Sequence, residues 1–142
     1  MIAKDHTDWM NKAIDLAKKG STAFGALIVN EDQTYIQAFN TTKKDGPTAH
    51  AEINAIQKLK QLNYNDARKL RLYTTVEPCP MCMSAIVWAG IGLVVFGASI
   101  ADAAKYGHQI HITSKEIVEK SWYSVSLIGG IQKEKCIELF EK

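Results

Sequence analysis

Two short motifs constrain this chain more than any other feature of its sequence. The first is His50-Ala-Glu52, and the second is Pro78-Cys-Pro-Met-Cys82. Apolar residues at every third position predict a helix over 49–62, and a β-rich run predicts a strand over 70–76. Because proline is tolerated in the first turn of a helix, the second motif predicts a helix over 78–89. Both motifs therefore lie at helix amino ends, which neighbouring strands can bring face to face.

The residue types in these motifs indicate a zinc site. Zinc prefers nitrogen and sulfur ligands in a tetrahedron, and a Cys-x-x-Cys pair at a helix start lets two thiolates converge on one ion. The N–H groups at such a start also favour thiolate over thiol. With His50, Cys79 and Cys82 as ligands, the fourth position stays open for water, whose pKa zinc lowers to about 7. Glu52 is then expected to lie beside the ion and to move protons.

Two other interpretations of the motifs stay open at this point. A Cys-x-x-Cys pair alone is also found in structural zinc knuckles and in redox pairs. A closed structural zinc site needs a fourth protein ligand, which Cys136, His108 or His111 could supply. That arrangement would make the chain a zinc-stabilised binding module rather than an enzyme.

The remaining periodicities predict an α/β fold. A helix is expected over 8–19, an antiparallel hairpin over 24–29 and 34–39, a buried strand over 93–98, a short helix within 102–119, an edge strand over 124–128 and a closing amphipathic helix over 132–140. Helical crossovers place helices on both faces of a sheet. We therefore expect a three-layer α/β/α sandwich, formed by residues 1–142 as a single domain.

Composition and cysteine content bound the cellular setting. The 142 residues carry a net charge of only +2, which gives no strong polyanion-binding signal. Three cysteines, an odd number, and an N-terminus without an apolar run argue against secretion and disulfides. Residues 81–100 carry no charge, but Gly90 and Gly92 divide them into pieces of ordinary core length. We expect a cytoplasmic protein that does not cross a membrane.

With both motifs in place, the chain resembles the cytidine-deaminase superfamily, whose zinc enzymes share the H-x-E and P-C-x-x-C pattern. The resemblance covers almost the whole chain and includes Phe24-Gly-Ala, Asn40, Pro47 to Glu52, Ala55-Ile56, Leu72-Tyr-Thr, Glu77 to Cys82 and Val95 to Ala98. It implies a five-stranded mixed sheet with helices on both faces, one catalytic Zn²⁺ per chain, and a homodimer whose interface lies close to the active sites.

The same resemblance assigns expected roles to further residues. Asn40 would hydrogen-bond the base, the Ala51 N–H would hold a polar group of the substrate, and Phe24 would border the pocket. Their alternative interpretations are a turn residue, an ordinary helix residue and a core aromatic. Glu77 resembles a residue that fixes the turn before Cys79.

The substrate is less constrained than the chemistry. Trp88, and the segment beginning Asp102-Ala-Ala, resemble substrate-contacting parts of guanine deaminases, although they could equally be helix packing and a helix cap. The segments 128–131 and 134–136 look more like tRNA adenosine deaminases. We expect hydrolytic deamination of a purine base or nucleoside, with guanine or guanosine first.

The alternatives are deamination of the tRNA wobble adenosine to inosine and, behind it, deamination of cytosine. A tRNA substrate would require positive charge around the pocket, because phosphate contacts dominate such binding. Lys105, His108, His111 and Lys115 could form a modest basic patch, although a solvated lysine face is the commoner explanation.

Overall fold

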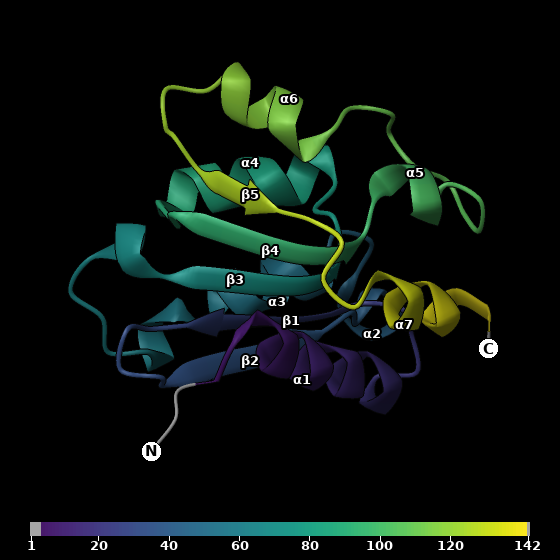
Figure 1. Ribbon diagram of the computed structural model, residues 1–142, viewed down its shortest axis with the longest axis horizontal. Coiled ribbons are helices and arrows are strands. Elements are labelled where there is room, and N and C mark those ends of the chain that lie inside the picture. Colours follow the sequence, from purple (N-terminus) through teal and green to yellow (C-terminus); the bar gives the residue numbers. More distant parts are fainter. Residues whose placement is uncertain (1–3, 142) are drawn as a thin grey trace.

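The computed structural model describes residues 4–141, which form one mixed sheet with helices on both faces (Figure 1). The strands are β1 (Gly25–Val29), β2 (Tyr35–Phe39), β3 (Arg71–Val76), β4 (Leu93–Ala98) and β5 (Ser126–Ile128). The helices are α1 (His6–Lys19), α2 (Thr42–Asp45), α3 (Ala51–Gln57), α4 (Pro80–Ala89), α5 (Ile100–Ala103), α6 (Ser114–Glu119) and α7 (Lys133–Glu138), with the 3-10 turns η1 (Leu59–Gln61), η2 (Ala67–Lys69) and η3 (Leu139–Glu141). The expected α/β/α architecture is confirmed.

The five strands follow the order β2-β1-β3-β4-β5. Strand β1 is antiparallel to both β2 and β3, whereas β3, β4 and β5 are parallel to one another. Helix α4 connects β3 to β4, and the segment with α5 and α6 connects β4 to β5, as parallel pairing requires a crossover. The start of β1 and the ends of β2, β3 and β4 therefore lie at the same end of the sheet.

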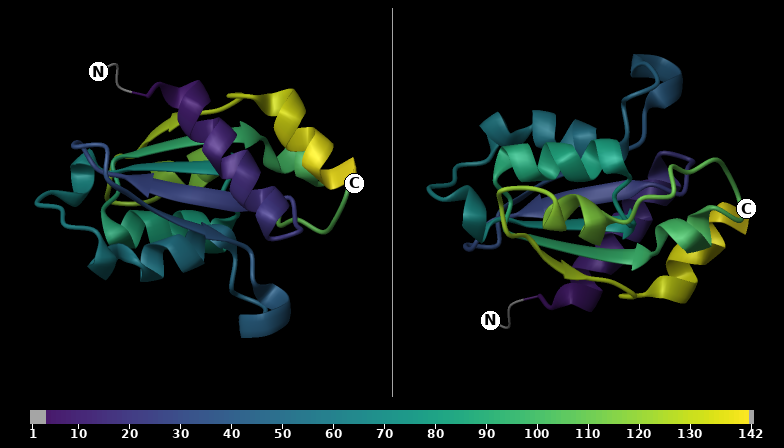
Figure 2. Two further views of the ribbon diagram at one scale, coloured as in Figure 1. Left: turned by 90° about the horizontal axis from the view of Figure 1, so that it is seen from below. Right: turned by 90° about the horizontal axis from the view of Figure 1, so that it is seen from above.

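Two apolar clusters fill the space between the sheet and its helices. Helices α1 and α7 pack on one face, and α3, α4 and α6 lie on the other (Figure 2). The side chains of alternate strand residues belong to the two different clusters. Leu27 and Tyr73 belong to the cluster under α1, while Ile28 and Leu72 belong to the cluster under α3 and α4. This period of two is what a sheet covered on both faces requires.

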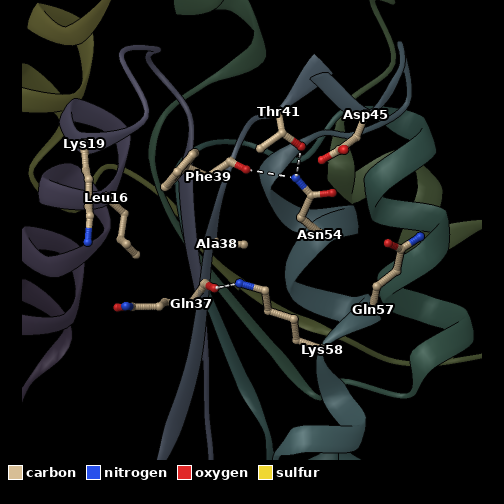
Figure 3. Close-up of a pocket in the computed structure, with 10 residues that line it drawn as sticks. All are labelled: Leu16, Lys19, Gln37, Ala38, Phe39, Thr41, Asp45, Asn54, Gln57 and Lys58. Atoms are coloured by element: carbon tan, nitrogen blue, oxygen red, sulfur yellow. Dashed lines mark hydrogen bonds between the residues drawn. The ribbon is translucent and has the colours of Figure 1, made fainter. Parts of the chain in front are cut away.

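Strand β2 forms one edge of the sheet, and side chains of the α3 segment cover its outward carbonyl groups (Figure 3). Lys58 Nζ donates to the Gln37 carbonyl at 2.7 Å. Asn54 Nδ2 donates to the Phe39 carbonyl at 2.9 Å and to Thr41 Oγ1 at 2.9 Å. Asn54 therefore also fixes the turn through which the chain leaves β2.

The helix expected over 49–62 is shorter in the structure. Helix α3 covers Ala51–Gln57, and the chain then tightens into the 3-10 turn η1. The apolar residues Ile53, Ile56 and Leu59 recur every third position, a spacing that fits three residues per turn as well as 3.6. Between β2 and α3 the chain forms the short helix α2, which has no buried residue and projects from the body of the molecule (Figure 2).

The uncharged stretch 81–100 is divided at its glycines into a helix and a strand, as predicted. Gly90 ends α4 in the left-handed conformation, with φ of 80°, and β4 begins at Leu93. None of the described helices combines the length and the apolar character needed to cross a membrane.

Candidate active site

The two motifs meet at the end of the sheet where β2 and β3 terminate. His50 is the N-cap residue of α3, and Cys79 is the N-cap residue of α4, both in an extended backbone conformation. Pro80 occupies the first helical position, where no N–H is needed, and Cys82 lies in the first turn. The predicted meeting of two helix amino ends is present in the structure.

His50, Cys79 and Cys82 form a group whose ligand atoms all lie within 4.8 Å of one another. His50 Nδ1 is 3.7 Å from Cys79 Sγ and 3.5 Å from Cys82 Sγ. A tetrahedral zinc with ordinary bond lengths places its nitrogen and sulfur ligands about 3.6 Å apart. The donor set and its spacing therefore fit a zinc ion.

A fourth protein ligand does not join this group among residues 4–141. Cys136 is buried on α7, where it belongs to the cluster on the α1 side of the sheet. His111 is exposed, and His108 contributes to the neighbouring cavity without entering the ligand group. The centre is thus a three-ligand site, the arrangement in which a catalytic zinc keeps one open position.

The hydrogen bond between the two thiols shifts their pKa values in opposite directions. The pKa of Cys79 is lowered to about 4, chiefly because Cys82 donates a hydrogen bond to it, while partial burial opposes the shift. The same hydrogen bond and burial raise the pKa of Cys82. The hydrogen bond to Cys79 also raises the pKa of His50. The motif thus favours a thiolate at Cys79 in the charge state that a metal requires.

Glu52 lies in the first turn of α3, two residues after the histidine, and is only 5% exposed. Burial raises the pKa of its carboxyl group to about 7, with the charge of Cys79 adding to the shift and hydrogen bonds opposing it. A carboxyl group with a pKa near neutrality can both accept and release a proton. Glu52 is outside the ligand group, as expected.

A cavity of about 470 Å³ opens beside the centre. It is lined by Phe24, Asn40, Pro47, His50, Glu52, Val76, Glu77, Cys79, Met81, His108, Gln109 and Ile110. The structure therefore brings Phe24 and Asn40 to the metal-binding residues. Ala51 is buried at the first position of α3, where its N–H has no partner within the helix.

The hydrogen bonds of Asn40 determine what it can offer a ligand. Its Oδ1 atom accepts from the Thr42 N–H at 3.0 Å and from the Thr42 hydroxyl at 3.0 Å. Since the carbonyl oxygen of the amide is occupied, the NH₂ group is left to donate. The side chain is thus suited to a carbonyl oxygen or an unprotonated ring nitrogen.

Trp88 and Asp102 lie outside this cavity. Trp88 is 77% exposed near the end of α4, edge to face with Trp122, which is 67% exposed, at 4.6 Å between ring centroids. Asp102 accepts from the Ser99 N–H at 2.9 Å in the capping box of α5 and is 3.8 Å from Lys133 Nζ. The substrate contacts expected of both residues stay predictions, while Asp102 has the helix-cap role named as its alternative.

Sequence reasoning missed part of the cavity lining. The sequence suggests His108 only as a fourth ligand or as part of a basic patch, and it gives no signal for Gln109 and Ile110. These residues lie in an irregular segment between α5 and α6, where no hydrophobic period marks a face. Met81 belongs to the second motif and Pro47 lies three residues before His50, so closeness to the ligands in the sequence is the one signal that identifies them.

A five-stranded α/β/α sheet with a His-Cys-Cys centre and a buried glutamate beside it defines a zinc-dependent deaminase. Residues 3–98 match the cytidine and deoxycytidylate deaminase zinc-binding region. The chain belongs to this deaminase family.

Known relatives carry more than one substrate specificity. A guanine deaminase of Bacillus subtilis (strain 168) is 38% identical over 120 residues, covering 80% of this chain and 77% of the relative. The tRNA-specific adenosine deaminase 2 of Xenopus tropicalis is 30% identical over 152 residues, covering 99% and 89%. The structure of a guanine deaminase from Nitrosomonas europaea has a TM-score of 0.84 at 19% identity, covering 99% of this chain and 85% of that one. Family and chemistry are thus defined, and substrate specificity is not.

Proposed function

We propose that this enzyme deaminates a free purine base or nucleoside, with guanine or guanosine as the first candidate. The observation that carries the proposal is the cavity in which two residues of the ligand group, His50 and Cys79, meet the buried Glu52 and the donating amide of Asn40. The similarity to the Bacillus subtilis guanine deaminase supports guanine in particular. In the reaction, water replaces an exocyclic amino group, giving a carbonyl group and ammonia.

Several residues in and beside the cavity have separate tasks in this reaction. His50, Cys79 and Cys82 would hold a zinc ion, which would supply an activated water. Glu52 would take one proton from that water and give it to the ring nitrogen, and would then pass the remaining hydroxyl proton to the amino group, which leaves as ammonia. The Asn40 amide and the Ala51 N–H orient the base through its acceptor atoms, and Phe24 packs beside the ring.

The charge of the lining supports a substrate without a phosphate group. The residues that line the described cavity include no lysine or arginine. A mononucleotide would bring about two negative charges that need such partners. A neutral base or nucleoside does not.

The wobble adenosine of a tRNA is the second candidate, and cytosine stands behind it. The Xenopus tropicalis relative aligns over nearly the whole chain, and its name gives tRNA specificity. Lys105 and Lys115 are exposed on either side of His108, which lines the cavity. Lysines close in sequence to a cavity-lining residue are the kind of cation that would contact the phosphates flanking a flipped base.

Trp88 supports a proposal about assembly. Together with Trp122, it exposes two large aromatic rings beside each other near the end of α4. Exposed aromatic clusters of this kind mark interaction surfaces. We assign this surface to a homodimer.

The cysteines support a proposal about localisation. Cys79, Cys82 and Cys136 are free thiols. Because thiols persist in reducing compartments, we assign the protein to such a compartment, the cytoplasm.

Ammonia release tests the proposed reaction. The zinc-loaded protein is incubated with guanine, guanosine, adenine, adenosine, cytosine, cytidine and an anticodon stem-loop RNA, and Glu52→Gln serves as the inactive control. Turnover of guanine or guanosine supports the proposal. Turnover of the RNA alone selects the second candidate, and release from none of them contradicts both.

A further inference from the structure

The Glu77 carboxylate lies between three segments of the chain and is only 8% exposed. Oε1 accepts from the Ile100 N–H at 2.9 Å. Oε2 accepts from the Ser114 N–H at 2.9 Å and from the Ser114 hydroxyl at 2.6 Å. Its own N–H donates to the Ala98 carbonyl at 2.7 Å, which fixes the backbone from which the carboxylate extends. Both carboxylate oxygens are thus engaged with groups far along the chain.

The two partners of Glu77 begin the two helices that follow β4. Ile100 is the first residue of α5, and Ser114 is the first residue of α6. An N–H at that position has no acceptor within its own helix. The hydroxyl groups of the N-cap residues Ser99 and Thr113 accept from other N–H groups, those of Asp102 and Glu116, three residues further along. Glu77 is therefore the acceptor that satisfies both helix starts.

Residues 104–112, which we call the pocket segment, lie between α5 and the N-cap residue of α6. His108, Gln109 and Ile110 of this segment line the cavity, yet Ile110 is 59% exposed. A segment that is largely exposed has little buried apolar surface to hold it in place. Tyr106 gives it a further attachment, since its hydroxyl donates to Glu141 at 2.9 Å and its ring stacks on Phe140.

Glu77 also precedes the metal-binding turn directly. Pro78 and the ligand Cys79 follow it in the chain. One carboxylate thus joins the turn that carries a zinc ligand to the first residues of the two helices on either side of the pocket segment. A shift of this carboxylate would move the substrate-facing residues relative to the metal.

We propose that Glu77 is a positioning residue that holds the pocket segment in register with the zinc centre, and that substrate affinity depends on this link. The consequence for affinity rests on the proposed function of the cavity. The consequence for the order of the segment rests on the hydrogen bonds alone.

Ser114→Ala is the first test, because it removes the short hydroxyl bond while keeping the backbone bond at the same residue. We expect zinc content to stay unchanged and KM for the preferred base to rise by roughly tenfold, with a smaller change in kcat. Hydrogen exchange of the pocket segment, measured on the zinc-loaded protein, should accelerate several-fold. Glu77→Gln should act in the same direction and more strongly, since an amide has one acceptor oxygen in place of two and leaves either the Ile100 or the Ser114 N–H facing a donor.

Thr113→Ala is the matched control. It removes the neighbouring hydroxyl, which caps α6 through the Glu116 N–H at 3.1 Å and does not contact Glu77. We expect it to lower the stability of α6 without changing KM or the exchange of residues 104–110. If Thr113→Ala raises KM and accelerates hydrogen exchange as Ser114→Ala does, the effect is due to helix capping. That result would overturn the proposal.

Unchanged KM and unchanged exchange in both Ser114→Ala and Glu77→Gln would also overturn it. The exchange measurement separates this proposal from the proposed function. If the unmodified enzyme deaminates none of the bases, the proposed function fails, and the exchange of the pocket segment alone decides the role of Glu77.

Discussion

His50 Nδ1 lies 3.5 Å from Cys82 Sγ, although the two residues belong to the starts of different helices. The metal centre therefore depends on how α3 and α4 are placed against each other. A zinc ion bound between them links the two helices and stabilises the folded state, because the unfolded chain has no preformed site.

Replacing Cys82 with serine should abolish stoichiometric zinc binding. A serine hydroxyl at neutral pH is a far weaker zinc ligand than a thiolate, and two ligands remain. Metal analysis after gel filtration and the thermal midpoint with and without chelator measure the result. Cys136→Ala is the control, since Cys136 is buried in the other cluster. Retention of zinc by Cys82→Ser would contradict the assigned ligand set.

Glu52→Gln should keep zinc and lose at least about a hundredfold in kcat, because the amide can no longer accept a proton from water. The steady-state rate of ammonia release, alongside the zinc content of the same sample, measures this. Glu119→Gln, an exposed change on α6, should leave the rate unchanged. Full activity in Glu52→Gln would contradict the proton-transfer role.

The stability of the metal-free protein should depend on pH because of the buried carboxyl group of Glu52. Burial raises the pKa of Glu52 from 4.5 to about 7. The folded state thus holds a proton between these values that the unfolded state has released, and stability falls as pH rises through this window. Relative to Glu52→Gln, the wild type should lose about 3 kcal/mol between pH 4 and pH 8.

Urea unfolding in the presence of chelator at several pH values measures that difference. Comparison with Glu52→Gln isolates the titration of Glu52 together with its effect on the pKa values of His50 and Cys82, both of which its charge raises. A difference that does not change with pH would show that Glu52 has an ordinary pKa in the folded state.

Asn40 should discriminate substrates through its donating group. Asn40→Ala removes the donor, and we expect KM to rise by roughly tenfold. Asn40→Asp places a carboxylate oxygen opposite the acceptor atom of the substrate. It should raise KM further, although the shape of the side chain is conserved. Asn63→Ala, an exposed position, serves as the control. A lower KM in Asn40→Asp than in Asn40→Ala would mean that the substrate donates at this position.

Trp88→Ala should weaken self-association by tenfold or more, since large aromatic residues at the centre of an interface carry much of its energy. Sedimentation velocity over a range of protein concentrations measures the dissociation constant. Lys120→Ala, an exposed change on the same side of the molecule, provides the comparison. An unmodified protein that stays monomeric at high concentration would contradict the proposed interface.

The chemistry of the site could be predicted because it depends on residue types at short spacing. His50, Cys79 and Cys82 combine nitrogen and sulfur ligands at two helix starts, which is typical of a zinc site. Pro80 begins the helix whose first turn brings the two thiols together. The layers could be predicted because β-strand alternation and helical crossovers leave few arrangements of such elements.

The remaining features depend on contacts between distant parts of the chain. The direction of β5 follows from the length of the crossover through α5 and α6, which carries no hydrophobic period. His108 and Gln109 reach the cavity because Glu77 holds both ends of an irregular segment. Trp88 is 77% exposed, although its local sequence resembles that of a packed helix face.

Strand β2 offers a consequence for handling the protein at high concentration. An open edge strand is a template for pairing with another chain and thus for aggregation. Here Lys58 and Asn54 occupy the carbonyl groups of Gln37 and Phe39, to which an incoming strand would donate. The opposite edge, β5, is only three residues long. Both borders of the sheet therefore resist intermolecular β-pairing, and Lys58→Ala should increase the tendency to form fibrils.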